Sequence, residues 1–259
     1  MKDGLLSVIV RTVGCDLQLL EKCLLSIQNS DYPDIEIIVV YQGIDLIKLD
    51  LIRNVKLKIS YSVVINEVEY DDRSKNLNIG LSMSKGSYLA FLDDDDYVAK
   101  NHYSNLITLL LKEKSSLAYC LCNVVNKEGL ILDDIFKNRY LDKIGLKKDN
   151  FITIHSFVVN KKNIDASLLY FQEDLKLAED YIFILPIFIN FKTSYHSERT
   201  SFYLIPEKES NSFTTYKSNG EYVNQRNLMN KYRREIKLNL FESAAIYYNR
   251  IIGKTRKIS

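Results

Sequence analysis

The stretch Ser87-Tyr88-Leu89-Ala90-Phe91-Leu92-Asp93-Asp94-Asp95-Asp96 decides the fold and points to the chemistry. Its first six residues form an apolar run, typical of a strand that is buried on both faces of a parallel sheet. Four carboxylates follow at once, although adjacent pairs repel by about 1 kcal/mol at about 4 Å even in water. At the carboxyl end of a buried strand, where open α/β sheets bind ligands, such oxygens suit Mg²⁺ or Mn²⁺ together with substrate phosphates. A solvated acidic loop is the alternative that the run alone leaves open.

Expected strands and helices alternate along the residues before this run. Asp16 is a suitable N-cap for the first helix, and Gly86 is placed to end the helix that precedes the acidic run. Strands that alternate with helices imply a parallel sheet with right-handed crossovers. The expected strands are residues 5–10, 35–40, 58–65 and 87–92, and the expected helices are residues 17–27 and 74–84.

The pattern is less regular after residue 100. Residues 126–150 are polar and rich in turn formers, and the polar residues 207–220 predict a loop that closes over a bound ligand. The periodicity predicts helices at 101–112, 179–190 and 221–252 and strands at 117–124 and 152–159. We expect one unit at 1–220, with halves 1–105 and 106–220, followed by a C-terminal helix and basic tail at 221–259.

Composition excludes several classes of protein. Apolar residues make up 46% of the 259 residues and charged residues 26%, which is ordinary for a globular protein, and no apolar run is long enough for a membrane span. The N-terminus lacks a signal-peptide cleavage site, and the four cysteines form neither a CxxC pair nor a zinc pattern. We therefore expect a cytoplasmic protein with reduced thiols, and no nucleic acid partner.

The C-terminal residues 231–259 carry most of the excess positive charge. They hold eight basic residues against Glu235 and Glu242, a local charge of +6. Such a tail suits peripheral contact with an anionic membrane surface or with a phosphate-bearing acceptor. A solvated helix face is an equally good interpretation.

Three segments in order carry a family resemblance: residues 7–12, residues 39–43, and residues 73–80 followed by 85–96. Together they resemble the family 2 glycosyltransferases of the GT-A fold. The resemblance covers residues 5–105 and a later island at 171–183. It implies a Rossmann-like, mostly parallel central sheet flanked by helices, with a C-terminal helical extension outside it.

The resemblance also implies a donor site. Asp93 and Asp94 fall where the family contacts the nucleotide ribose or supports the metal, and Asp95 falls on the carboxylate that ligates a divalent cation, Mn²⁺ or Mg²⁺. The neighbouring Asp96 is expected to cap or orient the following turn. Thr12 lies where the family holds the base.

Two positions depart from the family pattern. Gln42 lies with Thr12 at the base, where the family has an acidic residue or asparagine; an amide still offers a donor and an acceptor to a base edge. Leu77 replaces the arginine that often precedes the asparagine matched by Asn78. Arg73 or Lys75 is positioned to supply that charge to the donor.

The island at 171–183 is similar to the family stretch that ends in a Glu-Asp pair at the start of a helix. The resemblance implies that Asp180 is the general base and that Glu179 positions the acceptor or supports the base. A carboxylate at a helix N-terminus is held in a fixed direction by backbone N–H groups, which suits that role. Glu173 and Asp174 form a competing pair, and plain helix capping is the other interpretation of Glu179 and Asp180.

The resemblance therefore predicts an inverting, metal-dependent glycosyltransferase. Its expected donor is a nucleotide diphosphate-sugar, a UDP-sugar in the first instance, and its acceptor a glycan or lipid-linked hydroxyl in bacterial surface polysaccharide synthesis. A non-catalytic nucleotide-sugar-binding module or partner subunit is the alternative. A nucleotidyltransferase is disfavoured because residues 10–16 contain only Gly14 and form no glycine-rich phosphate loop.

Overall fold

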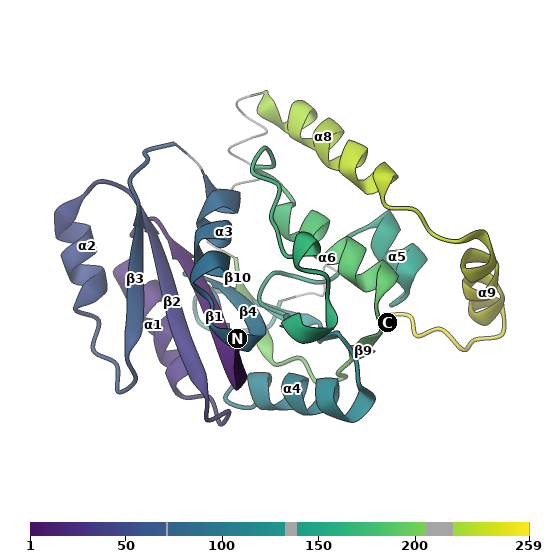
Figure 1. Ribbon diagram of the computed structural model, residues 1–259, viewed down its shortest axis with the longest axis horizontal. Coiled ribbons are helices and arrows are strands. Elements are labelled where there is room, and N and C mark those ends of the chain that lie inside the picture. The colour runs from purple at the N-terminus through teal and green to yellow at the C-terminus, as the bar shows by residue number, and fades with distance from the viewer. Residues whose placement is uncertain (71, 133–138, 206–219, 259) are drawn as a thin grey trace.

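A seven-stranded, mostly parallel sheet forms the centre of the computed structural model, which describes residues 1–70, 72–132, 139–205 and 220–258 (Figure 1). The strand order is β3-β2-β1-β4-β8-β6-β9, in which only β8 runs antiparallel to its neighbours. This confirms the expected α/β architecture. Its strands are β1 (Lys2–Thr12), β2 (Ile35–Gln42), β3 (Tyr61–Asn66), β4 (Gly86–Asp93), β6 (Leu117–Tyr119), β8 (Phe157–Asn160) and β9 (Thr193–Tyr195).

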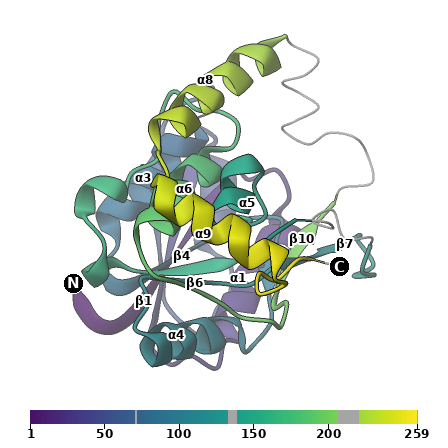
Figure 2. The ribbon, with the colours of Figure 1, turned by 90° about the vertical axis from the view of Figure 1, so that its right-hand side faces the viewer.

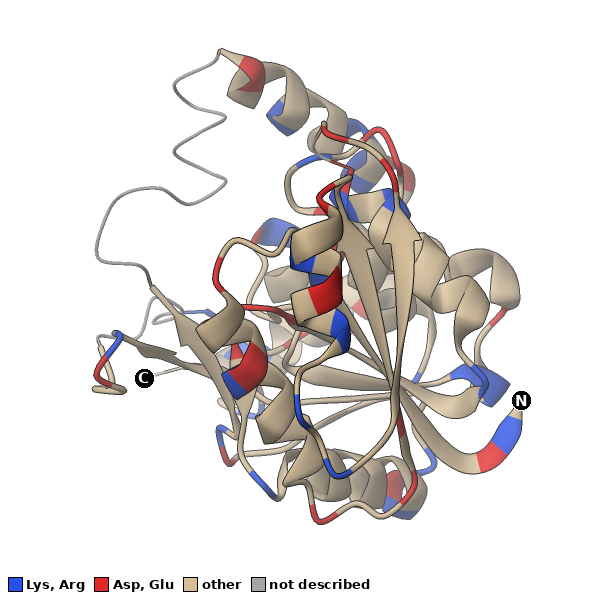
Figure 3. Cartoon of the chain, turned by 90° about the vertical axis from the view of Figure 1, so that its left-hand side faces the viewer, with Lys and Arg blue, Asp and Glu red and all other residues tan. Residues whose placement is uncertain are grey.

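Helices cover both faces of the sheet because its central strands are apolar on both faces. Along β1, Leu6, Val8 and Val10 pack into the apolar core on one face of the sheet, whereas Ile9 packs into the core on the other face. Charged residues are correspondingly rare on the strands and frequent on helices and loops (Figure 3). The helices α1 (Leu17–Gln28) and α4 (His102–Glu113) cover the face with Leu6, Val8 and Val10. The helices α3 (Arg73–Met83) and α6 (Glu179–Asn190) cover the face with Ile9, and we call the core on this face the main core.

The register of the parallel strands brings three chain segments to one edge. Arg11 of β1 lies opposite both Val40 of β2 and Asp93 of β4, and Gln42 lies opposite Asn66 of β3. All these residues lie within the last three positions of their strands, so their side chains gather where an open α/β sheet binds ligands.

The strand predicted at 117–124 is divided between two sheets. Its first half is β6, and its second half is β7 (Cys122–Val125), which pairs with β10 (Ser201–Leu204) in a small sheet that also contains β5 (Tyr97–Val98). The strand predicted at 152–159 begins only at Phe157, because a turn in which the N–H of Ser156 donates to the carbonyl of Thr153 precedes it. Two short helices were not predicted: α2 (Leu46–Arg53) and α5 (Lys143–Lys148).

The single helix predicted at 221–252 is wrong, because the chain forms α8 (Glu221–Glu235) and α9 (Leu240–Ile251) instead. Ile236 and Leu238 pack against the main core, which draws the chain out of the helical path. Asn239 then starts the second helix by accepting a hydrogen bond from the N–H of Phe241. Both helices lie on the side of the molecule that carries α5 and α6 (Figure 2). Apart from Gly220, the predicted loop at 207–220 lies outside the described residues.

Candidate active site

Arg11, at the end of β1, joins the two parts of the site. Its Nε and Nη2 donate to the two carboxylate oxygens of Asp93, at 2.7 and 3.1 Å, and its Nη1 donates to Oε1 of Glu179 at 2.6 Å. Burial opposes the charge of Arg11, but the two carboxylates outweigh it and raise the Arg11 pKa well above its ordinary value. Burial likewise favours neutral Asp93, yet Arg11 holds the pKa of Asp93 below its ordinary value. The arginine therefore keeps the Asp93 carboxylate ionised and holds the Glu179 carboxylate beside it through a charge-assisted hydrogen bond.

The sequence interpretation gave no role to Arg11. The available signal was its position, since a lone cation directly after the apolar strand at residues 5–10 stands at the ligand edge of the sheet.

Asp94 is held in place by a hydrogen bond from Thr12. The Thr12 hydroxyl donates to Oδ2 of Asp94 at 2.5 Å and accepts from the N–H of Gly14 at 2.9 Å. Burial raises the pKa of Asp94 to about 6, and the Thr12 hydrogen bond limits that rise. The Thr12 hydroxyl thus orients Asp94 without neutralising it.

Asp95 differs from its neighbours because no side-chain partner stabilises its charged form. No other side chain among the described residues makes a hydrogen bond or ion pair with it, and burial together with Asp96, Asp93 and Asp94 raises its pKa to about 8. No group of three or more His, Cys, Asp or Glu side chains in the described parts of the chain is arranged to hold a metal by itself. One carboxylate with unmet charge beside an open pocket fits a hard divalent cation whose other ligands are water and diphosphate oxygens.

Asp96 has a structural position. One carboxylate oxygen accepts from the N–H of Leu204 at 2.8 Å, and the other lies 2.9 Å from Nδ1 of His155, with both side chains buried. Burial lowers the pKa of His155, but Asp96 outweighs burial and raises it well above the ordinary value. The fourth aspartate therefore ties the strand end to β10, rather than only to the turn that follows it.

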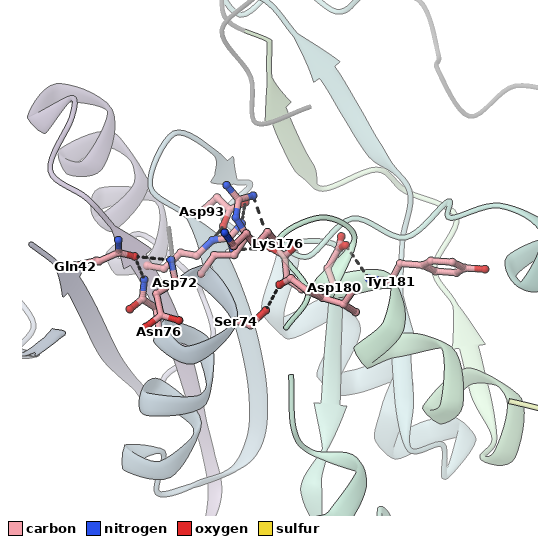
Figure 4. Close-up of polar contacts among 12 residues, drawn as sticks. Gln42, Asp72, Ser74, Asn76, Asp93, Lys176, Asp180 and Tyr181 are labelled. Carbon is pink, nitrogen blue, oxygen red and sulfur yellow. Dashed lines mark hydrogen bonds and ion pairs between the residues drawn. The ribbon is translucent and has the colours of Figure 1, made fainter. Parts of the chain in front are cut away.

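Gln42 organises the loop before α3. Its Oε1 accepts from Nδ2 of Asn76 at 2.7 Å and from the N–H of Asp72 at 3.3 Å, and its Nε2 donates to the carbonyl of Tyr70 at 2.5 Å (Figure 4). Asn66 extends this network by donating to Oδ1 of Asn76 at 2.7 Å. The second N–H of the Gln42 amide has no partner among the described residues, and Gln42 lines the pocket that opens beside this network.

A pocket of about 220 Å³ opens between these groups. It brings together six of the seven residues expected at the donor and metal site. Its lining consists of Arg11, Thr12, Val13, Gln42, Arg73, Asn76, Asp93, Asp94 and Asp95.

The pocket does not include Asn78, the seventh residue. The Asn78 amide donates to the carbonyl of Phe171 and accepts from its N–H, both at 2.9 Å, and it also reaches Glu173. Asn76 and Asn78 are two residues apart on a helix, so their side chains project about 200° apart. Since Asn76 faces the pocket, Asn78 faces away from it and holds residues 171–173 against α3.

Asp180 lies in the first turn of α6. The N–H of Tyr181 donates to its Oδ1 at 2.7 Å, and Ser74 fixes the preceding chain by donating to the carbonyl of Leu175 at 2.7 Å (Figure 4). Burial and the adjacent Glu179 raise the pKa of Asp180 to about 7. A carboxylate that gains and loses a proton near neutral pH suits general base catalysis.

Glu179 and the competing pair occupy different environments. Glu179 is 4% exposed and is bound by Arg11, with Arg73 at 3.9 Å, so it faces two cations that line the pocket. Glu173 contacts Asn78, and Asp174 accepts from the hydroxyl of Tyr232 at 2.8 Å, both at exposed positions. The competing pair therefore holds chain segments together at the surface.

Comparison with known proteins places these residues in a family. The model of the family described as Glycosyl transferase family 2 matches residues 7–168. The chain is 32% identical over 160 residues to GalNAc(5)-diNAcBac-PP-undecaprenol beta-1,3-glucosyltransferase of Campylobacter jejuni. This alignment covers 60% of the chain and 48% of that protein. The chain is 26% identical over 222 residues to an uncharacterized glycosyltransferase of Haemophilus influenzae, which covers 84% and 86% respectively. The chain thus spans about half the length of the first relative.

Solved structures share the fold. TarS residues 1–349 of Staphylococcus aureus in complex with UDP-GlcNAc superpose with a TM-score of 0.63 at 23% identity, over 79% of this chain and 60% of that one. The mannosyltransferase PcManGT of Pyrobaculum calidifontis, in complex with GDP-Man and Mn²⁺, superposes with a TM-score of 0.60 at 15% identity, over 85% and 62%. The expected GT-A fold is confirmed.

Proposed function

The chain belongs to glycosyl transferase family 2, and on that premise we propose that it is an inverting, metal-dependent glycosyltransferase. Its donor is a nucleotide diphosphate-sugar, and its acceptor is a hydroxyl of a glycan or lipid-linked molecule. The observation that carries the proposal is the Arg11 bridge, which fixes Asp93 of the donor pocket and Glu179, the neighbour of Asp180, at 2.7 and 2.6 Å. A donor site and a base are thereby held in one rigid unit, as inversion requires.

The residues divide the work as follows. Thr12, Asp94 and the remaining amide N–H of Gln42 bind the nucleoside, and Arg73 faces the diphosphate from the start of α3. Asp95 would hold the cation, which when bound offsets the charge that develops on the leaving diphosphate. Asp180 accepts the proton of the acceptor hydroxyl as that oxygen attacks the anomeric carbon from the opposite side.

The comparisons support the class of donor and acceptor. One structural neighbour binds UDP-GlcNAc, and the Campylobacter relative is named for an undecaprenol-diphosphate glycan. A UDP-sugar donor and an acceptor from bacterial surface polysaccharide synthesis are therefore our proposal for this chain.

Contact with an anionic membrane surface is part of the proposal. None of the helices in the described ranges has the length and apolar character that a bilayer crossing needs. However, α9 exposes Leu240, Phe241 and Ile251 by more than four-fifths each, at 85%, 86% and 83%, while Glu242 and Arg250 bind the body of the protein. An outward apolar stripe next to a basic tail suits an interfacial helix.

Replacement of Asp180 tests the catalytic assignment. Asp180→Asn is expected to lower sugar transfer by about 10²–10⁴-fold, with donor affinity retained, because the amide cannot accept the proton. Asp174→Asn is the matched control, since the Asp174 side chain is exposed and bonds only the hydroxyl of Tyr232 among the described residues, a hydrogen bond that the asparagine oxygen still accepts. Equal activity of wild type and Asp180→Asn, measured by release of the nucleoside diphosphate with acceptor present, would contradict the assignment.

A further inference from the structure

Helix α8 packs against residues 174–176, which belong to the segment that leads to Asp180. Gln225 of α8 accepts from the N–H of Lys176 at 2.8 Å, and the hydroxyl of Tyr232 donates to the carboxylate of Asp174 at 2.8 Å. Leu228, Met229 and Tyr232 also pack against the main core. These contacts fix α8, which lies beyond the residues matched by the family model, next to α6, whose first turn carries Asp180 (Figure 2).

A second pocket, of about 530 Å³, lies between α8, the end of α5 and the residues just before α6. Its lining includes Leu177 and Ala178, and Ala178 immediately precedes Glu179 and Asp180 at the start of α6. The end of α5 contributes Lys148, and α8 contributes Arg226 and Arg233. The pocket is separate from the donor pocket, because the two linings share no residue.

Three cations line this second pocket, and their charge is not offset there. Asp149, the one acidic residue in its lining, lies 2.7 Å from Arg139 and so already has a cationic partner. Arg233 donates from Nη1 to the carbonyl of Lys148 at 3.2 Å, which holds the guanidinium at the pocket wall and adds no negative charge. Lys148 and Arg226 are exposed and form no ion pair within the described residues. Cations gathered in a concave surface attract an anion rather than stabilise the fold.

We propose that this second pocket binds a phosphate group of the acceptor. The inference rests on the proposed function, in which Asp180 takes the proton from the acceptor hydroxyl. Arg226 and Arg233 present planar forks of N–H donors, which match phosphate oxygens, and Lys148 adds a mobile ammonium group. A phosphate bound there anchors the acceptor beside Ala178, so that its hydroxyl reaches Asp180. The phosphate belongs either to a lipid diphosphate or to a phosphodiester polymer.

Binding of phenyl phosphate tests the pocket directly. The titration uses protein saturated with UDP and Mg²⁺, so that the donor pocket is filled. The double variant Lys148→Gln, Arg226→Gln is expected to bind the probe about tenfold more weakly, because two charged donors are lost. Lys231→Gln, Arg234→Gln is the matched control, since both residues are exposed on α8 and lie outside the pocket lining. Absence of binding to the wild type, or equal affinity of wild type and double variant, overturns the proposal.

Steady-state kinetics separate this proposal from the proposed function and distinguish the two phosphate sources. One arm uses a short-chain polyprenyl-diphosphate sugar as acceptor, and the other uses a ribitol-phosphate oligomer. In the arm whose acceptor is used, KM for the acceptor is expected to be about tenfold higher for the double variant than for the wild type. KM for the donor is expected to be the same for both proteins. An unchanged acceptor KM in the arm that supports transfer overturns the phosphate pocket. Failure of the wild type to transfer or hydrolyse any UDP-sugar contradicts the proposed function instead, and the phenyl phosphate titration still decides the pocket.

Discussion

Replacement of Arg11 by methionine is expected to destabilise the protein strongly and in a pH-dependent manner. Removal of one partner of a buried ion pair costs about 3–5 kcal/mol, because the remaining charge is left uncompensated. Arg11 has two such partners, and their side chains are 23% exposed for Asp93 and 5% for Glu179. Arg73 lies 3.9 Å from Glu179 and offsets part of the loss. We therefore expect the lower end of the range, about 3 kcal/mol at about pH 7.5.

The sign of the pH dependence follows from Asp93. In the wild type Arg11 lowers the Asp93 pKa, so Asp93 contributes stability that is present above its unfolded pKa and is lost as pH falls. In the variant the cation is absent and burial favours protonated Asp93, so ionisation of Asp93 now costs stability as pH rises. The difference in free energy of unfolding between wild type and variant is therefore expected to shrink from about pH 7.5 to about pH 4.5.

Urea denaturation at these two pH values measures the effect. Lys2→Met is the control, because its partner Asp34 lies 3.7 Å away and both side chains are more than half exposed, at 63% and 57%. That variant is expected to lose about 0.5 kcal/mol or less. A loss below about 1 kcal/mol for Arg11→Met, or a loss that does not change with pH, would refute the reasoning.

Three further predictions concern activity and localisation. Because Asp180 must be deprotonated to act as base and its pKa is raised to about 7, kcat/KM is expected to fall about tenfold per pH unit below that value; a flat profile down to about pH 5.5 contradicts the assignment. Asp95→Asn is expected to weaken Mn²⁺ binding in the presence of UDP by at least about tenfold by calorimetry, and equal affinity in the variant would exclude Asp95 as a ligand. Phe241→Glu, on the exposed stripe of α9, is expected to reduce co-sedimentation with anionic vesicles, whereas Glu242→Gln is not; equal binding of Phe241→Glu and wild type speaks against the stripe.

The first half of the fold was predictable because its signals are local. The apolar run at 87–92 becomes β4, and Asp16 caps α1 by accepting from the N–H groups of Gln18 and Leu19. Beyond residue 115 the decisive contacts are tertiary. The chain leaves β6 for a second sheet without a glycine or proline at the crossing, and burial of Ile236 and Leu238 ends α8 without a breaker residue. Periodicity carries no information about such contacts.

The candidate site was predictable where adjacent residues share a location and not where partners are distant in sequence. Thr12, Gln42 and Arg73 reach one pocket because each lies at the edge where β1, β2 or α3 ends or begins. Asn78 does not reach it, because the helical period turns it toward Phe171. The bridge from Arg11 to Glu179 spans 168 residues, and no local pattern specifies it.

The four aspartates are unequal because the protein supplies partners to three of them. Asp93 is paired with Arg11, Asp94 accepts from Thr12, and Asp96 is paired with His155. Asp95 alone has no partner in another described side chain, and burial together with the three neighbouring carboxylates raises its pKa to about 8, so that it is mostly protonated near neutral pH until a cation offsets its charge. Arg11, Thr12 and His155 are bound to the other three aspartates and cannot move to Asp95. A positive charge that stabilises ionised Asp95 therefore has to come with the ligand. A cation that arrives with the donor diphosphate meets this requirement, and a loosely solvated acidic loop would not need such an arrangement of partners.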